Sequence, residues 1–141
     1  MKKILRILLV CIIIDILLLT FQNAEGTVRL SEGLRLWLDR LGFHMSFHTI
    51  RSNAHFVLYF IFGLILSMYG LQVGWNRKII LLTGIIFGML DEGIKVFLPT
   101  REFDILDLLR DWIGVGFALV IVIFLSRNHN KDRNSKETDV V

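Results

Sequence analysis

The chain has little cysteine and proline, and each shortage narrows the structures open to it. Its single cysteine, Cys11, has no partner in the chain, which excludes an internal disulfide and leaves the redox compartment undetermined. Its single proline, Pro99, predicts a helix end, because proline disfavours helical backbone at the preceding residue. Charge of one sign is not in large excess either. The net charge is +3, which we assign to membrane topology rather than to nucleic-acid binding.

Apolar residues, by contrast, are abundant and come in blocks. They make up 54% of the 141 residues, above the roughly 45–50% of soluble globular chains, and this pattern predicts an integral membrane protein. The length allows one domain, residues 1–126, followed by a polar tail. We predict an all-α, four-helix membrane bundle whose spans cover about residues 4–21, 53–74, 79–98 and 105–125.

The first apolar run extends from Ile4 to Phe21 behind a basic start. As a helix it is about 27 Å long, close to the roughly 30 Å of the hydrocarbon core. The residues after it contain no clean A-x-A cleavage site, so we predict an uncleaved anchor helix rather than a signal peptide. Asp15 falls past the middle of this span. Two interpretations are open for Asp15. It is a structural carboxylate that bonds to a neighbouring helix or stays neutral, or it is part of a polar site.

Residues 27–49 form the first loop, and part of this loop has helical spacing. Leu34, Trp37 and Leu41 fall on one face, and Ser31 is a candidate N-cap. We predict a short amphipathic helix that begins there and lies in the membrane interface. A lid packed on the ends of the spans is the alternative.

Two histidines at the end of this loop have metal-ligand spacing. His44 and His48 are four residues apart and would share a helix face. No third ligand accompanies them, and the sequence contains no established metal motif. We therefore assign no metal ligands from the sequence.

The third span carries charges deep within it. Asp91 and Glu92 come about 18–20 Å after its predicted start and are therefore inside the membrane thickness. Lys95 follows within one helical turn, so pairs inside the helix are expected. Gly84 and Gly88 form a small-xxx-small face that lets another helix approach.

The fourth span must also include charged residues. Its apolar block, residues 113–125, is about 20 Å long as a helix and too short to cross alone. The helix is therefore predicted to begin near Ile105, which draws Asp107, Arg110 and Asp111 into its first turns.

Four spans place both termini on one side of the membrane. The termini and the short loop at residues 72–78 carry more Lys and Arg than the other two loops. The positive-inside rule then predicts cytoplasmic termini in the cell membrane. Residues 127–141 are polar and charged, and we predict a disordered cytoplasmic tail.

Ionisable groups of all four predicted spans fall at one depth, the outer third of the bilayer. Charges that face lipid there cost roughly 2.5–3.5 kcal/mol each, so we predict that they line a polar pocket open to the outside. The predicted binding residues are Arg51, His55, Tyr59, Asp91, Glu92, Lys95, Arg101, Asp107, Arg110 and Asp111.

These positions belong to three motifs in a fixed order. The motifs are Arg51-x3-His55-Phe56-x2-Tyr59-x3-Gly63, Asp91-Glu92-x2-Lys95-x-Phe97-x-Pro99-x-Arg101 and Asp107-x3-Asp111-x2-Gly114. In order and spacing they resemble the VanZ-like family of small bacterial membrane proteins, over about residues 51–116. The family usually has Gln where this chain has Lys95 and Asn where it has Asp111. We predict that these two residues form an ion pair between the third and fourth spans.

The resemblance implies a role at the cell surface, since the member that gives the family its name is associated with teicoplanin resistance. It implies lowered binding of a lipoglycopeptide, with membrane lipid, the lipoglycopeptide or a lipid-linked envelope precursor as the partner. It implies no established mechanism and no cofactor.

The charged residues themselves leave three hypotheses open. In a membrane enzyme acting on a lipid-linked envelope substrate, His55, Glu92 and Asp91 are the proton-transfer candidates, and the carboxylates could instead hold Mg²⁺. In a binding protein the same groups take a ligand without chemistry. In a structural cluster, acidic and basic side chains pair to lock the helices together. The arginines that would hold a phosphate in the enzyme are Arg51, Arg101 and Arg110.

Overall fold

The computed structural model describes residues 2–22, 24–44, 46–99 and 102–138, with the backbone alone for residues 24, 25, 27, 30, 47, 48, 51 and 129–138. This part of the chain contains five α-helices and no strand, which confirms the predicted all-α fold. Helices α1, α3 and α5 contain stretches long and apolar enough to cross a membrane. The helices are α1 (Lys2–Phe21), α2 (Ala24–Arg40), α3 (Phe47–Gln72), α4 (Arg77–Lys95) and α5 (Ile105–Thr138).

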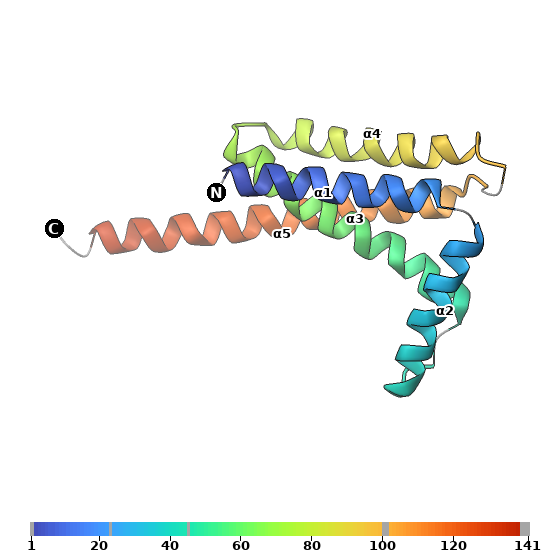
Figure 1. Cartoon of the computed structure of the whole chain (residues 1–141). Helices are drawn as coiled ribbons and strands as arrows, with labels where there is room; N and C mark the ends of the chain where they lie inside the picture. Colours follow the sequence, from blue (N-terminus) through green and yellow to red (C-terminus); the bar gives the residue numbers. More distant parts are fainter. Residues whose placement is uncertain (1, 23, 45, 100–101, 139–141) are drawn as a thin grey trace.

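Helices α1, α3, α4 and α5 pack together, whereas α2 turns away and contacts only the start of α3 closely (Figure 1). The start of α1, the turn between α3 and α4 and the far half of α5 lie toward one end of the bundle (Figure 1). The end of α1, the end of α4 and the start of α5 lie toward the other end, on the side of α2.

Glycines allow α3, α4 and α5 to approach one another closely. A Cβ at Gly63 would stand 2.8 Å from the Cα of Val115, and a Cβ at Gly114 would stand 2.9 Å from the carbonyl oxygen of Phe56. A Cβ at Gly84 of α4 would stand 2.5 Å from the side chain of Val115. The helix approach predicted for the Gly84 face therefore occurs, and its partner is α5.

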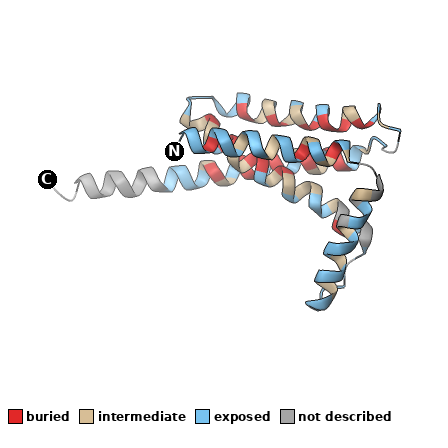
Figure 2. Cartoon of the chain, in the orientation of Figure 1, coloured by how far each residue is buried: buried red, intermediate tan, exposed pale blue. Residues whose placement is uncertain are grey.

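Apolar side chains lie both inside and outside the bundle. The outward faces of α1, α4 and α5 include Ile7, Leu82 and Phe117, each more than half exposed. Figure 2 shows the buried residues facing inward along the four packed helices, with α2 mostly exposed. A helix that is apolar all round is typical of a buried or membrane-spanning helix. The core consists of Ile16, Tyr59, Phe62, Leu66, Ile80, Val115 and Leu119.

Helix α3 begins earlier than the span predicted from residue 53. Its N-cap is Ser46, whose hydroxyl oxygen accepts a hydrogen bond from the backbone N–H of Thr49 at 3.1 Å. Serine is a preferred N-cap because its oxygen satisfies one of the free N–H groups of the first turn. The helix therefore adds about two turns before the apolar stretch.

Helix α2 is longer than the predicted amphipathic helix. It starts at Ala24, because no proline interrupts the residues before Ser31. Ser31 therefore lies inside the helix and does not cap it. The helix ends at Arg40, and Gly42 in the turn that follows has a φ of 85°. There the N–H of Phe43 donates to the carbonyl of Leu38 at 3.0 Å, a Schellman motif that glycine favours.

Helix α4 ends at Lys95, three residues before the predicted end of the third span. The following N–H groups bond to carbonyls three residues back, including Leu98 to Lys95 at 3.0 Å. In this tighter turn the carbonyl groups at the end of α4 accept hydrogen bonds before the chain reaches Pro99. Proline cannot continue a helix.

Helix α5 begins at Ile105, as predicted, and continues beyond the predicted end of the fourth span. The carboxylate of Asp104 accepts a hydrogen bond from the N–H of Leu106 at 2.8 Å and so caps the first turn. The backbone is helical to Thr138, where a disordered tail was predicted from residue 127. No glycine or proline stops the helix in this stretch.

Candidate functional site

One end of the bundle holds a set of inward-facing charged side chains, referred to below as the charged cluster. Glu92 and Asp111 have no exposed surface, and Asp91, Lys95 and Asp107 are also buried. Burying a charge is costly unless it is paired and hydrogen-bonded, so the contacts of each member decide what the cluster can do. Its members are His55 on α3, Asp91, Glu92 and Lys95 on α4, and Asp107, Arg110 and Asp111 on α5.

On α4 the cluster is held by an ion pair within one helical turn. The ammonium group of Lys95 donates to Oε1 of Glu92. The other oxygen of Glu92 accepts a weaker bond from the backbone N–H of Asp104 at 3.3 Å. Glu92 is therefore fixed both to its own helix and to the segment that leads into α5.

The predicted ion pair between Lys95 and Asp111 is wrong. Lys95 bonds to Glu92 instead, and neither oxygen of Asp111 accepts a hydrogen bond from the described residues. The reason is local: Glu92 lies three residues before Lys95 on the same helix face, which is the favourable spacing for a pair within a helix.

On α5 two aspartates face the histidine of α3. His55 Nε2 lies 3.6 Å from Oδ2 of Asp107, and His55 Nδ1 lies 3.4 Å from Oδ1 of Asp111. Arg110 donates to Oδ1 of Asp107 at 2.6 Å. Asp107 therefore has a permanently charged partner, whereas among the described residues Asp111 faces only the imidazole of His55.

Several buried polar atoms around Asp111 are not hydrogen-bonded. Both of its carboxylate oxygens, His55 Nδ1 and the hydroxyl of Tyr59 have no hydrogen-bond partner among the described residues. The Tyr59 side chain is fully buried. A buried polar group left without a partner costs about 1–3 kcal/mol, and more when it is charged. This part of the cluster is therefore poorly satisfied by the protein alone.

Helix α1 contributes Thr20 to the site, not Asp15. The carboxylate of Asp15 is exposed on α1, outside the cluster. The hydroxyl of Thr20 is buried and contacts both the carboxylate of Asp91 and, at 2.9 Å, the carbonyl of Ile16. Depth along the helix predicted that α1 reaches the site, but rotation about the helix axis decides which side chain faces it. A hydroxyl at the end of the apolar run was the only sequence signal for Thr20.

The predicted phosphate clamp is only partly described. The side chain of Arg51 and all of Arg101 lie outside the described residues. Arg110 is half-buried and already paired with Asp107. Arg110 is therefore the one arginine of the three whose side chain is described, and it is paired with a carboxylate.

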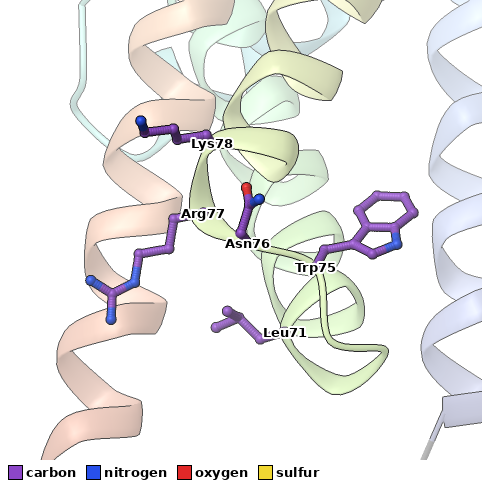
Figure 3. A pocket seen from close by; sticks show the side chains of 5 residues that line it. All are labelled: Leu71, Trp75, Asn76, Arg77 and Lys78. Carbon is purple, nitrogen blue, oxygen red and sulfur yellow. The ribbon is translucent and has the colours of Figure 1, made fainter.

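A shallow depression lies at the opposite end of the bundle, at the turn between α3 and α4. Figure 3 shows its side chains diverging, with Trp75 and Arg77 pointing to opposite sides. Along α3 it is about 25 Å from His55. It brings no reactive groups together and is separate from the charged cluster. Its lining residues are Leu71, Trp75, Asn76, Arg77 and Lys78.

Comparisons with models of known families, with curated proteins and with solved structures give no match. The fold and the site together define a class: an all-helical chain in which three helices are long and apolar enough to cross a membrane and in which charged side chains are buried between helices. The family rests on the sequence motifs alone.

Proposed function

We propose that this chain is a VanZ-like integral membrane protein that acts at the cell surface through the charged cluster and lowers the binding of lipoglycopeptides such as teicoplanin. The observation that carries this proposal is the distribution of polarity. Large apolar side chains cover the outside of α1, α4 and α5, while five charged residues are buried inside. Ionisable groups that face the interior of a membrane bundle mark functional sites by default.

In this proposal α4 also crosses the membrane, in addition to α1, α3 and α5. Its 19 residues make a helix of about 28 Å, close to the hydrocarbon thickness. By composition alone α4 has too many charged residues to count as a membrane-spanning helix. Three of these residues, Asp91, Glu92 and Lys95, are however buried inside the bundle. Its exposed side chains, such as Leu82, Ile86 and Leu90, are apolar.

Four spans would place the cluster near the outer surface. The start of α1, the α3–α4 turn and the far half of α5 lie toward one end (Figure 1), and this end carries the basic residues that favour the cytoplasm. The cluster is at the other end, next to α2. The apolar side chains exposed on α2, including Leu34 and Trp37, suit a helix that lies in the outer membrane interface.

A membrane enzyme acting on a lipid-linked envelope substrate is the second candidate. The pair of His55 and Asp111, with 3.4 Å between Nδ1 and Oδ1, favours it, because a histidine beside a carboxylate can transfer protons. The described residues offer little to hold a phosphate, since both Lys95 and Arg110 are already paired.

Expression in a teicoplanin-sensitive bacterial host tests both candidates. Wild-type chain is compared with His55→Gln, Asp111→Asn and the control His44→Gln, in which the same substitution changes an exposed histidine in the loop after α2. Membrane levels, teicoplanin susceptibility and the pool of lipid-linked precursors are measured for each variant.

We expect cells with the wild-type chain or His44→Gln to be less susceptible to teicoplanin than the host. Cells with either cluster variant, at equal membrane levels, should be as susceptible as the host. An unchanged precursor pool then favours binding, and a changed pool favours the enzyme. Wild-type chain that leaves susceptibility at the host level contradicts both the lipoglycopeptide role and the VanZ-like assignment on which it rests.

A further inference from the structure

We propose that His55, Glu92 and Asp111 bind a divalent transition-metal ion of the zinc or manganese type. Each residue offers one ligand atom, and these atoms lie within 4.8 Å of one another. They come from α3, α4 and α5, so the ion would join three helices. The inference concerns the same cluster as the proposed function and rests on that proposal only for its membrane setting.

The spacing of the ligand atoms fits a metal ion better than a hydrogen-bonded pair. Nitrogen and oxygen ligands at about 2.0–2.2 Å from zinc stand about 3.5 Å apart in a tetrahedral site. His55 Nδ1 and Asp111 Oδ1 are 3.4 Å apart and do not form a hydrogen bond. The third ligand is Glu92, and its oxygen would move closer to the other two ligand atoms when the ion binds.

The lack of hydrogen bonds at Asp111 is an independent observation that points to a ligand. Its carboxylate has no exposed surface, and both oxygens are without a hydrogen-bond partner among the described residues. His55 Nδ1, which lies 3.4 Å from Oδ1 of Asp111, also has no hydrogen bond among the described residues. A neutral imidazole and a carboxylate that face each other in this way present the lone pairs that a metal ion takes up.

The charge of the cluster also favours a cation. Among the described residues it contains four carboxylates, and only Glu92 and Asp107 have a Lys or Arg partner. Asp91 contacts Thr20, and Asp111 faces His55. A divalent ion would balance the two remaining negative charges.

The surroundings of the ligands match those of a metal site. Glu92 is oriented by Lys95 on one oxygen and by the Asp104 N–H on the other, and each oxygen keeps a lone pair for an ion. His55 directs its second nitrogen, Nε2, toward Asp107 at 3.6 Å. Metal-ligating histidines usually have such a carboxylate behind them. One nitrogen with two carboxylates suits zinc or manganese, whereas magnesium and calcium prefer oxygen alone.

Metal analysis of the purified full-length chain tests this site. The chain is prepared in detergent with any polyhistidine tag removed, stripped with a chelator and titrated with Zn²⁺, Mn²⁺, Mg²⁺ or Ca²⁺. Bound metal per chain is measured by elemental analysis. The variants are Asp111→Asn and His55→Gln. The control changes the exposed pair His44 and Asp39, which also places a histidine beside a carboxylate, at 3.3 Å.

We expect one Zn²⁺ or Mn²⁺ per wild-type and control chain, and an affinity at least about 100-fold lower in each cluster variant, since even outer-shell changes cost 10–100-fold. The visible spectrum of bound Co²⁺ in wild-type chain reports the ligand set directly and does not depend on the folding of any variant. Wild-type chain that takes up no Zn²⁺ or Mn²⁺, that binds only Mg²⁺ or Ca²⁺, or whose binding survives both cluster substitutions overturns the proposal. Susceptibility is not read here, so failure of this test leaves the lipoglycopeptide proposal standing, and the reverse also holds.

Discussion

At the scale of single residues, Lys95 and Glu92 form a buried ion pair within the cluster. Both side chains are buried, and Lys95 is the one cation that bonds to Glu92 among the described residues. Replacing one member of a buried pair leaves the other charge uncompensated, which is far more costly than replacing both.

We therefore predict that Lys95→Met lowers the free energy of unfolding by about 3–5 kcal/mol. The double substitution Lys95→Met with Glu92→Gln should recover most of this loss, because it removes the orphaned charge. Unfolding of the purified chain in mixed micelles measures the three variants as a double-mutant cycle. Equal instability of the single and double variants would contradict a dominant Lys95–Glu92 pair.

At the scale of helices, the packing of α3 against α5 depends on glycines at defined positions. Gly114 and Gly116 are two residues apart on α5, but they face different surroundings. A Cβ at Gly114 would stand 2.9 Å from the carbonyl oxygen of Phe56, whereas a Cβ at Gly116 would have no neighbour within 4 Å.

Gly114→Ala is expected to lower the free energy of unfolding by about 1–3 kcal/mol, since it forces the α3 and α5 backbones apart. Gly116→Ala serves as the matched control and should be neutral or slightly stabilising, because alanine has the higher helix propensity. The same micelle unfolding assay compares them. Equal effects of the two substitutions would mean that α3 and α5 do not meet at Gly114.

Helix positions were more predictable than the directions of side chains. The start of α5 at Ile105 followed from length alone, since the apolar block after it could not cross a membrane. Asp15 was left as a possible member of the site because its depth is right, yet its side chain is exposed. Asp15 is on α1, which has apolar residues on all faces. The sequence therefore contained no hydrophobic stripe to indicate which face of α1 turns inward.

Partners within the cluster were harder to predict than its members. Most of the residues predicted for the site and described in the structure lie together, although they come from three helices. Lys95 had Glu92, Asp91 and Asp111 within plausible reach, and sequence spacing does not fix the rotamer that selects one of them. The proposed metal-ligand set was not predicted as a set, because its three members are far apart in the sequence and match no established metal-binding motif.

At the scale of the whole molecule, the number of spans decides which loops share a side of the membrane. Three helices qualify by length and composition, and we propose α4 as a fourth. If α4 crosses the membrane, its two ends face opposite sides. Arg77 at its start and Phe97 just after its end are both exposed.

Cysteine labelling in intact cells measures this topology. In a Cys11→Ser background, we predict that Phe97→Cys reacts with a membrane-impermeant maleimide and that Arg77→Cys reacts only after the cells are opened. His44→Cys, in the loop after α2, should behave like Phe97→Cys. Reaction of Phe97→Cys and Arg77→Cys under the same conditions would show that α4 does not cross.

The central claim is that the charged cluster is kept for function and not for stability, and Asp111 tests it most directly. Its buried carboxylate has no hydrogen-bond partner among the described residues, so Asp111→Asn removes a poorly compensated charge while keeping the shape of the side chain. The measurement is the thermal midpoint of the purified, chelator-treated chain. We predict that Asp111→Asn has a midpoint equal to or above that of the wild type. A midpoint lowered as far as that of Lys95→Met would contradict the claim and make the cluster a structural lock between helices.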